Sequence, residues 1–98
     1  MDEAPVVRRS FTVRLENGLH LRPWMQFVKL AHRYKAKIEV VKDVARSDAR
    51  SMLSLLALAA KQGDVIVVEA VGDDAVEAVD ALIDMLDRYD DSEEANSQ

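Results

Sequence analysis

His20 lies where a strand pattern gives way to a helix pattern, and it is followed directly by Leu21, Arg22 and Pro23. A helix N-terminus presents unpaired backbone N–H groups and the positive end of the helix dipole, so an anion attached to an imidazole there would find donors in place. Arg22 adds a fixed positive charge with planar donors that suit phosphate oxygens. A lone histidine at a helix start is more often a cap or a packing residue; its neighbours favour a functional role for His20.

Asn17 precedes His20 by three residues and has two interpretations. Its side-chain amide can hydrogen-bond the imidazole and orient the ring. It can equally be a turn residue ahead of Gly18, which alone would explain its presence. His32 falls on the outer side of the following helix and is expected to be solvated. We find no second acid, base or metal cluster beside His20, so an enzyme in its own right is the least favoured function.

The elements that must position these residues follow from the spacing of apolar side chains. Period-two alternation or β-branched composition predicts strands at residues 6–15, 37–42, 44–48 and 65–71. Apolar residues at three- and four-residue steps predict helices at residues 21–34, from Ser51 to a cap near Gly63, and from Ala75 to Leu86. Ser51 is the expected N-cap of the second helix. Because each strand has one apolar side, we expect an α+β fold, with a four-stranded, mainly antiparallel sheet and three helices packed on one face.

The composition limits the class of protein. The chain has 98 residues, a net charge of −5 and no cysteine, which suits one domain without disulfides or thiolate chemistry. We place this domain at residues 1–87 and expect the acidic residues 88–98 to be a disordered tail. The acidic balance argues against a nucleic-acid surface, and no apolar run suggests a signal sequence or membrane insertion. A cytoplasmic location, protein partners, no metal and no cofactor are expected.

Three stretches resemble the HPr family, the histidine phosphocarriers of the bacterial phosphoenolpyruvate-dependent sugar phosphotransferase system. Residues 17–23, with the sequence NGLHLRP, resemble its active-site signature. Residues 50–53 and 63–66 resemble its regulatory-serine segment and the following strand, and residues 72–82 resemble its last helix. Together they cover roughly residues 6–87 in the same order and spacing.

This resemblance implies that His20 accepts a phosphoryl group on Nδ1 from phosphorylated enzyme I and donates it to an enzyme IIA-type domain. Catalysis would belong to these partners, with Arg22 steadying the phosphate. Ser51 would be the regulatory serine that HPr kinase/phosphorylase modifies, although a plain N-cap explains it equally well. Apolar residues around His20 would form the partner-binding surface of a monomer: Leu21, Met25, Met52 and Leu53. The alternative for Leu53 is a place in the core.

The sequence departs from the family where Leu21 and Trp24 replace small residues and where Ser54 replaces a glycine. Trp24 can wedge under the sheet or lean toward the active ring. Two other functions stay open. One is a regulatory phosphorelay protein controlled mainly through Ser51, without sugar transport. The other is a small anion-binding α+β domain that holds its ligand at the helix end and never forms a phosphohistidine.

Overall fold

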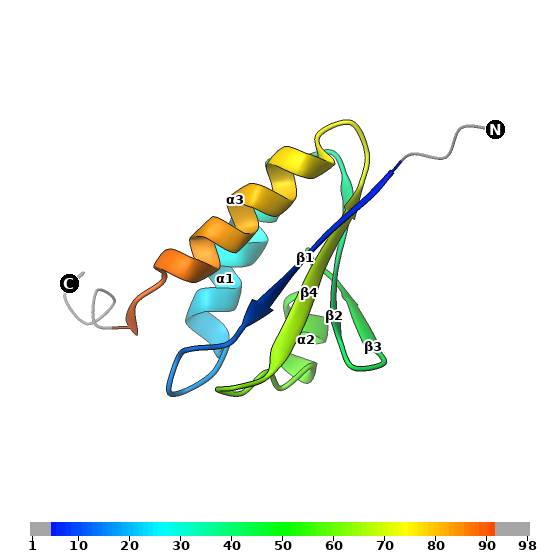
Figure 1. The fold of residues 1–98 in the computed structure, drawn as a ribbon. Helices are drawn as coiled ribbons and strands as arrows, with labels where there is room; N and C mark the ends of the chain where they lie inside the picture. Colours follow the sequence, from blue (N-terminus) through cyan, green and yellow to red (C-terminus); the bar gives the residue numbers. More distant parts are fainter. Residues whose placement is uncertain (1–4, 92–98) are drawn as a thin grey trace.

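Four antiparallel strands form one sheet in the order β1-β4-β2-β3. The computed structural model describes residues 5–91, and in it three helices lie on one side of this sheet (Figure 1). The elements, in chain order, are β1 (Val6–Thr12), α1 (Leu21–Ala31), β2 (Lys37–Lys42), β3 (Ala45–Asp48), α2 (Met52–Ala57), β4 (Val65–Val71) and α3 (Ala75–Arg88). The predicted fold class is confirmed.

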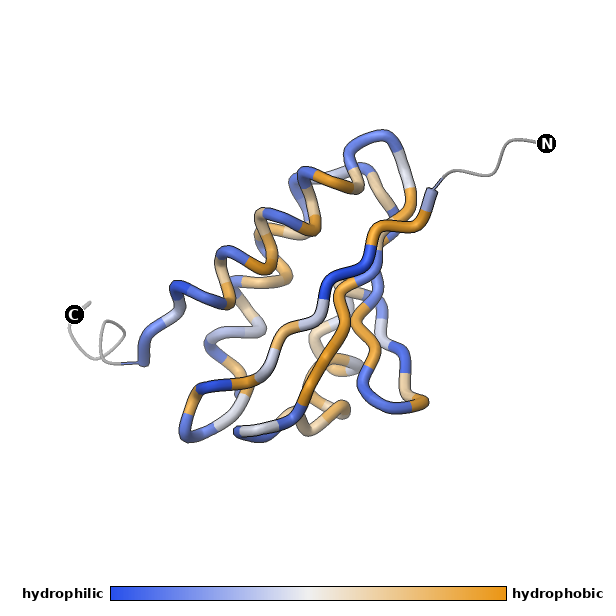
Figure 2. Tube along the Cα trace, in the orientation of Figure 1, coloured by the Kyte–Doolittle hydropathy of each residue, from blue (hydrophilic) through white to orange (hydrophobic). Residues whose placement is uncertain are grey.

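Alternation along the strands decides which face of the sheet the helices cover. Ile66, Val68 and Ala70 of β4 are fully buried, and they pair across the sheet with Phe11 of β1 and Val40 of β2, among others. Figure 2 shows β4 as an almost continuous hydrophobic segment through the middle of the molecule. Burying this face removes large apolar side chains from water, which is the main driving force for folding.

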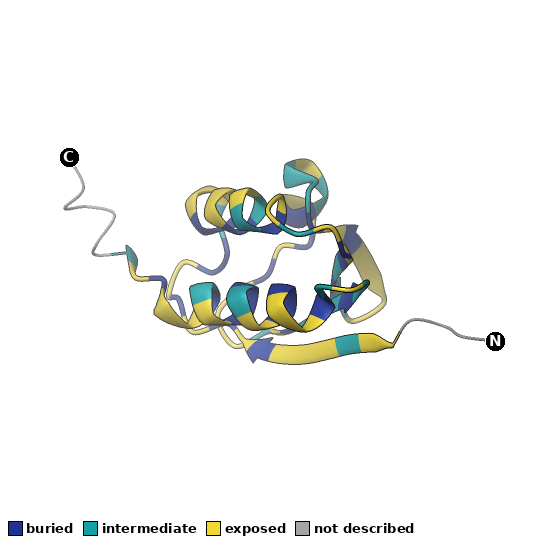
Figure 3. Ribbon diagram, turned by 90° about the horizontal axis from the view of Figure 1, so that it is seen from above, coloured by how far each residue is buried: buried dark blue, intermediate teal, exposed yellow. Residues whose placement is uncertain are grey.

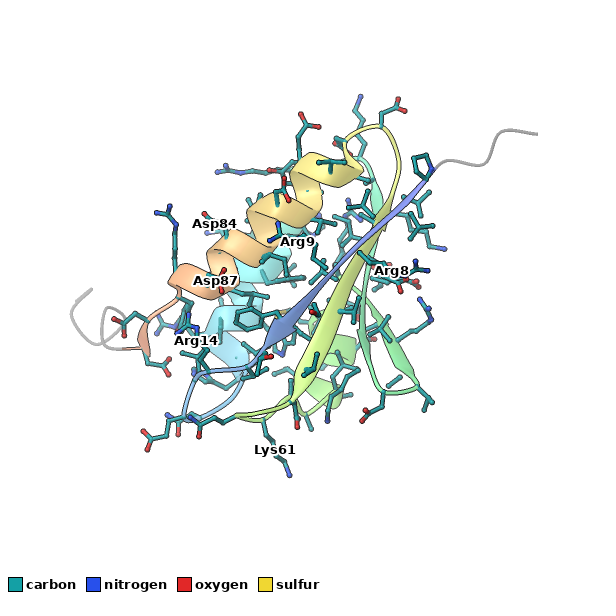
Figure 4. All side chains as sticks on the ribbon, viewed as in Figure 1. Arg8, Arg9, Arg14, Lys61, Asp84 and Asp87 are labelled. Carbon is teal, nitrogen blue, oxygen red and sulfur yellow. The ribbon has the colours of Figure 1, made fainter. Side chains whose placement is uncertain are left out.

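The opposite face of the sheet carries charged side chains. Arg8 of β1 and Arg46 of β3 both bind the carboxylate of Glu69 on β4, at 2.9 and 3.0 Å, and Arg46 also binds Glu39 of β2 at 3.0 Å. Arg46, with Arg8 contributing less, holds the pKa of Glu69 below its usual value. Figure 4 shows Arg8 on the side of the sheet away from α3. This network keeps the uncovered face polar.

The helices bury narrow apolar stripes against the sheet. Trp24 and Phe27 of α1 are 0% exposed and meet edge to face, with ring centroids 5.1 Å apart. Trp24 is therefore a core residue, which decides between its two predicted positions. Leu82 and Leu86 of α3 are also fully buried, and Figure 3 shows the outer surface of α3 exposed and its inner surface buried.

Helix α1 ends at Ala31 rather than at the predicted Tyr34. The guanidinium of Arg50 donates hydrogen bonds to the carbonyl oxygens of Ala31, Tyr34 and Ala36, which accounts for backbone acceptors left over beyond the last turn. Asp74 accepts hydrogen bonds from the N–H groups of Lys35 and Ala36, both at 2.9 Å. These hydrogen bonds hold the pKa of Asp74 below its usual value, and the one from Lys35 has the largest effect.

Three further predicted boundaries are wrong. β1 stops at Thr12 instead of residue 15, because the chain beyond it pairs with a loop rather than continuing the ladder with β4. α2 ends at Ala57, well before Gly63. The left-handed residue that follows α2 is Ala59, with φ 51°, whereas Gly63 belongs to the turn that leads into β4. β3 begins at Ala45, one residue after the predicted start.

The packed chain extends past residue 87, where the sequence placed the start of the tail. Arg88 is the last residue of α3, and Tyr89 is 7% exposed. The remainder of the predicted tail, residues 92–98, lies outside the described residues, so its disorder stays a prediction. Between residues 5 and 91 no helix is both long enough and apolar enough to cross a membrane.

Candidate functional site

The loop before α1 is shaped by a close approach of two backbones. Gly18 has φ 71°, its N–H donates to the carbonyl of Leu15 at 2.9 Å, and the N–H of Leu19 donates to the carbonyl of Ala60 at 2.9 Å. A Cβ on residue 18 would lie 2.5 Å from the Ala60 oxygen, so only glycine fits. Leu19 is 4% exposed and anchors the loop in the core. The backbone that carries His20 is therefore held in a fixed conformation.

The same loop is fastened to the segment that leads into β4. The N–H of Val13 donates to the carbonyl of Asp64 at 2.8 Å, and the N–H of Gly63 donates to the carbonyl of Val13 at 2.9 Å. The carboxylate of Asp64 accepts the N–H of Lys61 at 2.8 Å, which holds the pKa of Asp64 below its usual value. These hydrogen bonds take the place of the strand pairing that was predicted beyond Thr12.

His20 is the N-cap of α1, with φ −91° and ψ −162°, and its side chain caps no amide. The first turn of a helix provides no acceptor within the helix for its own N–H groups, here those of Leu21 and Arg22. Pro23 has no N–H group. The first turn contains no acidic residue. With 36% of its side chain exposed, His20 stands at a positive helix end that solvent and partners can reach. Arg22 is exposed in the same turn.

The imidazole of His20 is held by Asp91. Its Nε2 lies 3.1 Å from Oδ1 of Asp91, whose side chain is 33% exposed. A carboxylate only accepts hydrogen bonds, so this contact places the proton of a neutral ring on Nε2 and the lone pair on Nδ1. Asn17, which the sequence predicts to orient the ring, is an exposed turn residue, and the hydrogen bond of Nε2 is made with Asp91.

Contacts at the end of α3 hold the following segment, which carries Asp91, close to His20. The guanidinium of Arg14, from the loop after β1, donates to the carbonyl oxygens of Leu86 and Asp87; Figure 4 shows Arg14 at this end of the helix. Tyr89 then enters the core, and the chain turns toward the loop before α1 (Figure 1). The sequence analysis did not select Asp91. The continuation of the apolar stripe of α3 through Leu86 to Tyr89 indicates that the chain stays packed nearly to this residue.

Ser51 is the N-cap of α2, as predicted. Its Oγ accepts the N–H of Ser54 at 3.3 Å and donates to the Ser54 hydroxyl at 3.0 Å. Ser51 is partly exposed. The hydroxyl of Ser54, present where the family usually has glycine, is therefore engaged with the predicted regulatory residue.

Several apolar side chains of α1 and α2 are exposed. Leu21 is 53% exposed, Met25 46% and Leu53 81%, so the core alternative for Leu53 is wrong. Met52 is partly buried against the core, and Leu56, which the sequence analysis did not select, is 36% exposed. Since α1 packs against α2, these exposed apolar side chains lie on two neighbouring helices, of which α1 carries His20 at its start.

A family model described as "PTS HPr component phosphorylation site" matches residues 7–88. The chain belongs to the HPr family. Its members are phosphocarriers of the phosphotransferase system and not themselves enzymes.

Relatives of two kinds fall within the family. The phosphocarrier protein HPr of Vibrio cholerae is 38% identical over 80 residues, covering 82% of this chain and 94% of that protein. The HPr-like protein Crh of Halalkalibacterium halodurans is 34% identical over 83 residues, covering 85% and 99%. The crystal structure of HPr from Bacillus anthracis superposes with a TM-score of 0.77 at 36% identity, covering 82% of this chain and 95% of that one.

Proposed function

We propose that this HPr-family protein carries a phosphoryl group on Nδ1 of His20, accepting it from phosphorylated enzyme I and donating it to an enzyme IIA-type domain. The observation that carries the proposal is the contact of Nε2 with Asp91, which leaves Nδ1 as the ring nitrogen with an available lone pair.

The helix end supplies the electrostatic support that a transient phosphohistidine requires. Backbone N–H groups of the first turn and the positive end of the α1 dipole attract the phosphoryl oxygens, and Arg22 adds a guanidinium two residues from His20. Because His20 is partly exposed, the group stays within reach of a second protein. The site can thus hold a phosphoryl group and present it to a second protein.

The exposed apolar residues of α1 and α2 fit partner docking. Leu21 and Met25 are exposed on the helix that His20 caps, while exposed Leu53 and partly buried Met52 lie on the neighbouring α2. Methionine adapts to differently shaped partners. One such surface serves enzyme I and the acceptor in turn, which suits a monomer. We place this exchange in the cytoplasm, where phosphoenolpyruvate, the phosphoryl source implied by the family, is produced.

Incubation with phosphoenolpyruvate and enzyme I from the same organism, followed by intact mass measurement, tests the proposal. We expect one added phosphoryl group that is lost in acid, present in wild type and Ser51→Ala and absent from His20→Ala. An enzyme I that is active on itself yet transfers nothing to wild type would contradict the carrier function.

A regulatory role for Ser51 is the second candidate, favoured by the Crh relative and by the position of Ser51 at the start of α2. Phosphorylation there would add about two negative charges beside the exposed Leu53. Such charge would oppose docking of a partner without unfolding the helix. Incubation with HPr kinase/phosphorylase and ATP should yield an acid-stable phosphate that Ser51→Ala lacks; no incorporation into wild type would contradict this role.

A further inference from the structure

We propose that Asp91, carried on the segment that follows α3, is a positioning residue for phosphoryl transfer at His20. The inference rests on the proposed carrier function. It goes beyond that function by assigning a role to a residue outside the matched family segment, which ends at residue 88. Asp91 would act through the imidazole and would not touch the phosphoryl group.

The geometry allows Asp91 to fix both the ring and its charge. Its Oδ1 accepts the Nε2 proton at 3.1 Å, which leaves the lone pair of the neutral ring on Nδ1. Both side chains are about one third exposed, at 36% and 33%, so water screens the pair only partly. A carboxylate that orients a histidine in this way also stabilises positive charge on the ring.

The transfer step produces such charge. The lone pair of Nδ1 attacks phosphorus, the N–P bond forms, and the bond from phosphorus to the donor atom breaks with its electron pair returning to the donor. No proton leaves Nε2, so the ring becomes cationic while the carboxylate of Asp91 faces it. The stabilisation grows from the ground state to the transition state, and it therefore affects the rate of transfer rather than the binding of the partner.

The attachment of the segment supports a fixed carboxylate. Tyr89, two residues earlier, is 7% exposed, and Arg14 holds the carbonyl oxygens of Leu86 and Asp87. Arg14 and His20 leave the same loop, between β1 and α1. The loop that presents the histidine therefore also binds the end of the helix that presents its carboxylate, so the two move together.

Two variants of Asp91 separate its orienting role from its charge. Asp91→Ala removes the acceptor and the charge, whereas Asp91→Asn keeps an oxygen acceptor and removes only the charge. Asp87→Ala is the matched control, since it removes one carboxylate four residues earlier from an exposed side chain. With phosphorylated enzyme I as donor, we expect kcat to fall about tenfold in Asp91→Ala and about threefold in Asp91→Asn. KM for enzyme I should stay within about twofold, and the control should match wild type.

A spectroscopic readout tests the contact without any transfer. Nitrogen NMR of the imidazoles reports which ring nitrogen is protonated, and His32, the second of two histidines, is an exposed internal reference. In wild type, neutral His20 should favour the Nε2–H form more strongly than His32 does. In Asp91→Ala the two rings should become alike.

Three results would overturn the role of Asp91. The first is an unchanged His20 tautomer ratio in Asp91→Ala, and the second is an unchanged kcat. The third is faster transfer in Asp91→Ala, which would identify the carboxylate as a shield that repels the phosphoryl group. A wild-type chain that accepts no phosphoryl group would instead refute the carrier function itself, and the role of Asp91 would fall with it.

Discussion

Gly18→Ala tests how the loop that presents His20 is held. Residue 18 has φ 71°, and a Cβ there would lie 2.5 Å from the carbonyl oxygen of Ala60 and 3.1 Å from Cα of Lys61. Both obstructing atoms belong to backbone, so no side chain can rotate away. The Ala60 carbonyl also accepts the N–H of Leu19, so relieving the overlap means breaking the bond that leads into His20.

Gly63 provides a control for the backbone term alone. Its φ is 93°, and a Cβ on it would meet nothing within 4 Å. A left-handed conformation costs an L-residue about 1–2 kcal/mol, which is the loss expected for Gly63→Ala. Gly18→Ala adds the overlap, for which overpacking of a rigid interior costs about 1–3 kcal/mol. The expected loss at residue 18 is therefore about 2–5 kcal/mol.

Urea unfolding at equilibrium, followed by tryptophan fluorescence of the buried Trp24, measures both losses. The variants should unfold at lower urea concentration than wild type with unchanged slope, and Gly18→Ala should lose more than Gly63→Ala. Phosphorylation of His20 should also slow in Gly18→Ala. Equal losses in stability for the two variants would refute the argument that the approach to Ala60 fixes the loop.

Three further outcomes are expected in the same unfolding assay. Arg50→Ala should lose about 2–3 kcal/mol, since three carbonyl oxygens lose a charged donor; Arg50→Lys, without the planar fork, should recover little of it, and full recovery would contradict this assignment. Ser51→Ala should lose about 1 kcal/mol and Ser51→Asp much less, because aspartate also caps a helix; equal losses would argue against a cap. Asp74 has a pKa lowered in the folded protein, so its stabilisation is present above the unfolded value of 3.8 and lost as pH falls through the lower folded value. The difference between wild type and Asp74→Ala should therefore shrink from about pH 7 to about pH 2, and a constant difference would show that the carboxylate charge is not involved.

Local patterns in the sequence were sufficient where one element decides its own structure. The β-branched residues in 65–71 define β4, and the spacing from Ala75 to Leu86 defines the buried face of α3. Ser51 is recognisable as a cap because serine accepts a first-turn amide locally. The exposure of Leu21 and Met25 follows from the same helical geometry, since they lie off the stripe centred on Phe27.

Tertiary contacts decided the features that the sequence did not predict. α1 ends where the guanidinium of Arg50, nineteen residues after Ala31, donates a hydrogen bond to the Ala31 carbonyl. β1 ends where the N–H of Val13 donates to the carbonyl of Asp64 in a loop instead of to a strand. Nε2 of His20 contacts Asp91, which lies seventy-one residues away in the sequence. No local periodicity encodes such pairs, although the position of Tyr89 on the α3 stripe indicates that the chain stays packed to that point.

The central claim is that Nδ1 of His20 carries the phosphoryl group. The most direct measurement is the phosphorus–nitrogen coupling in the nitrogen-labelled protein after phosphorylation by enzyme I and phosphoenolpyruvate. We predict coupling between phosphorus and Nδ1 of His20, with the Nε2 proton retained beside Asp91. Phosphorus bonded to Nε2, to His32 or to a serine oxygen would contradict the account.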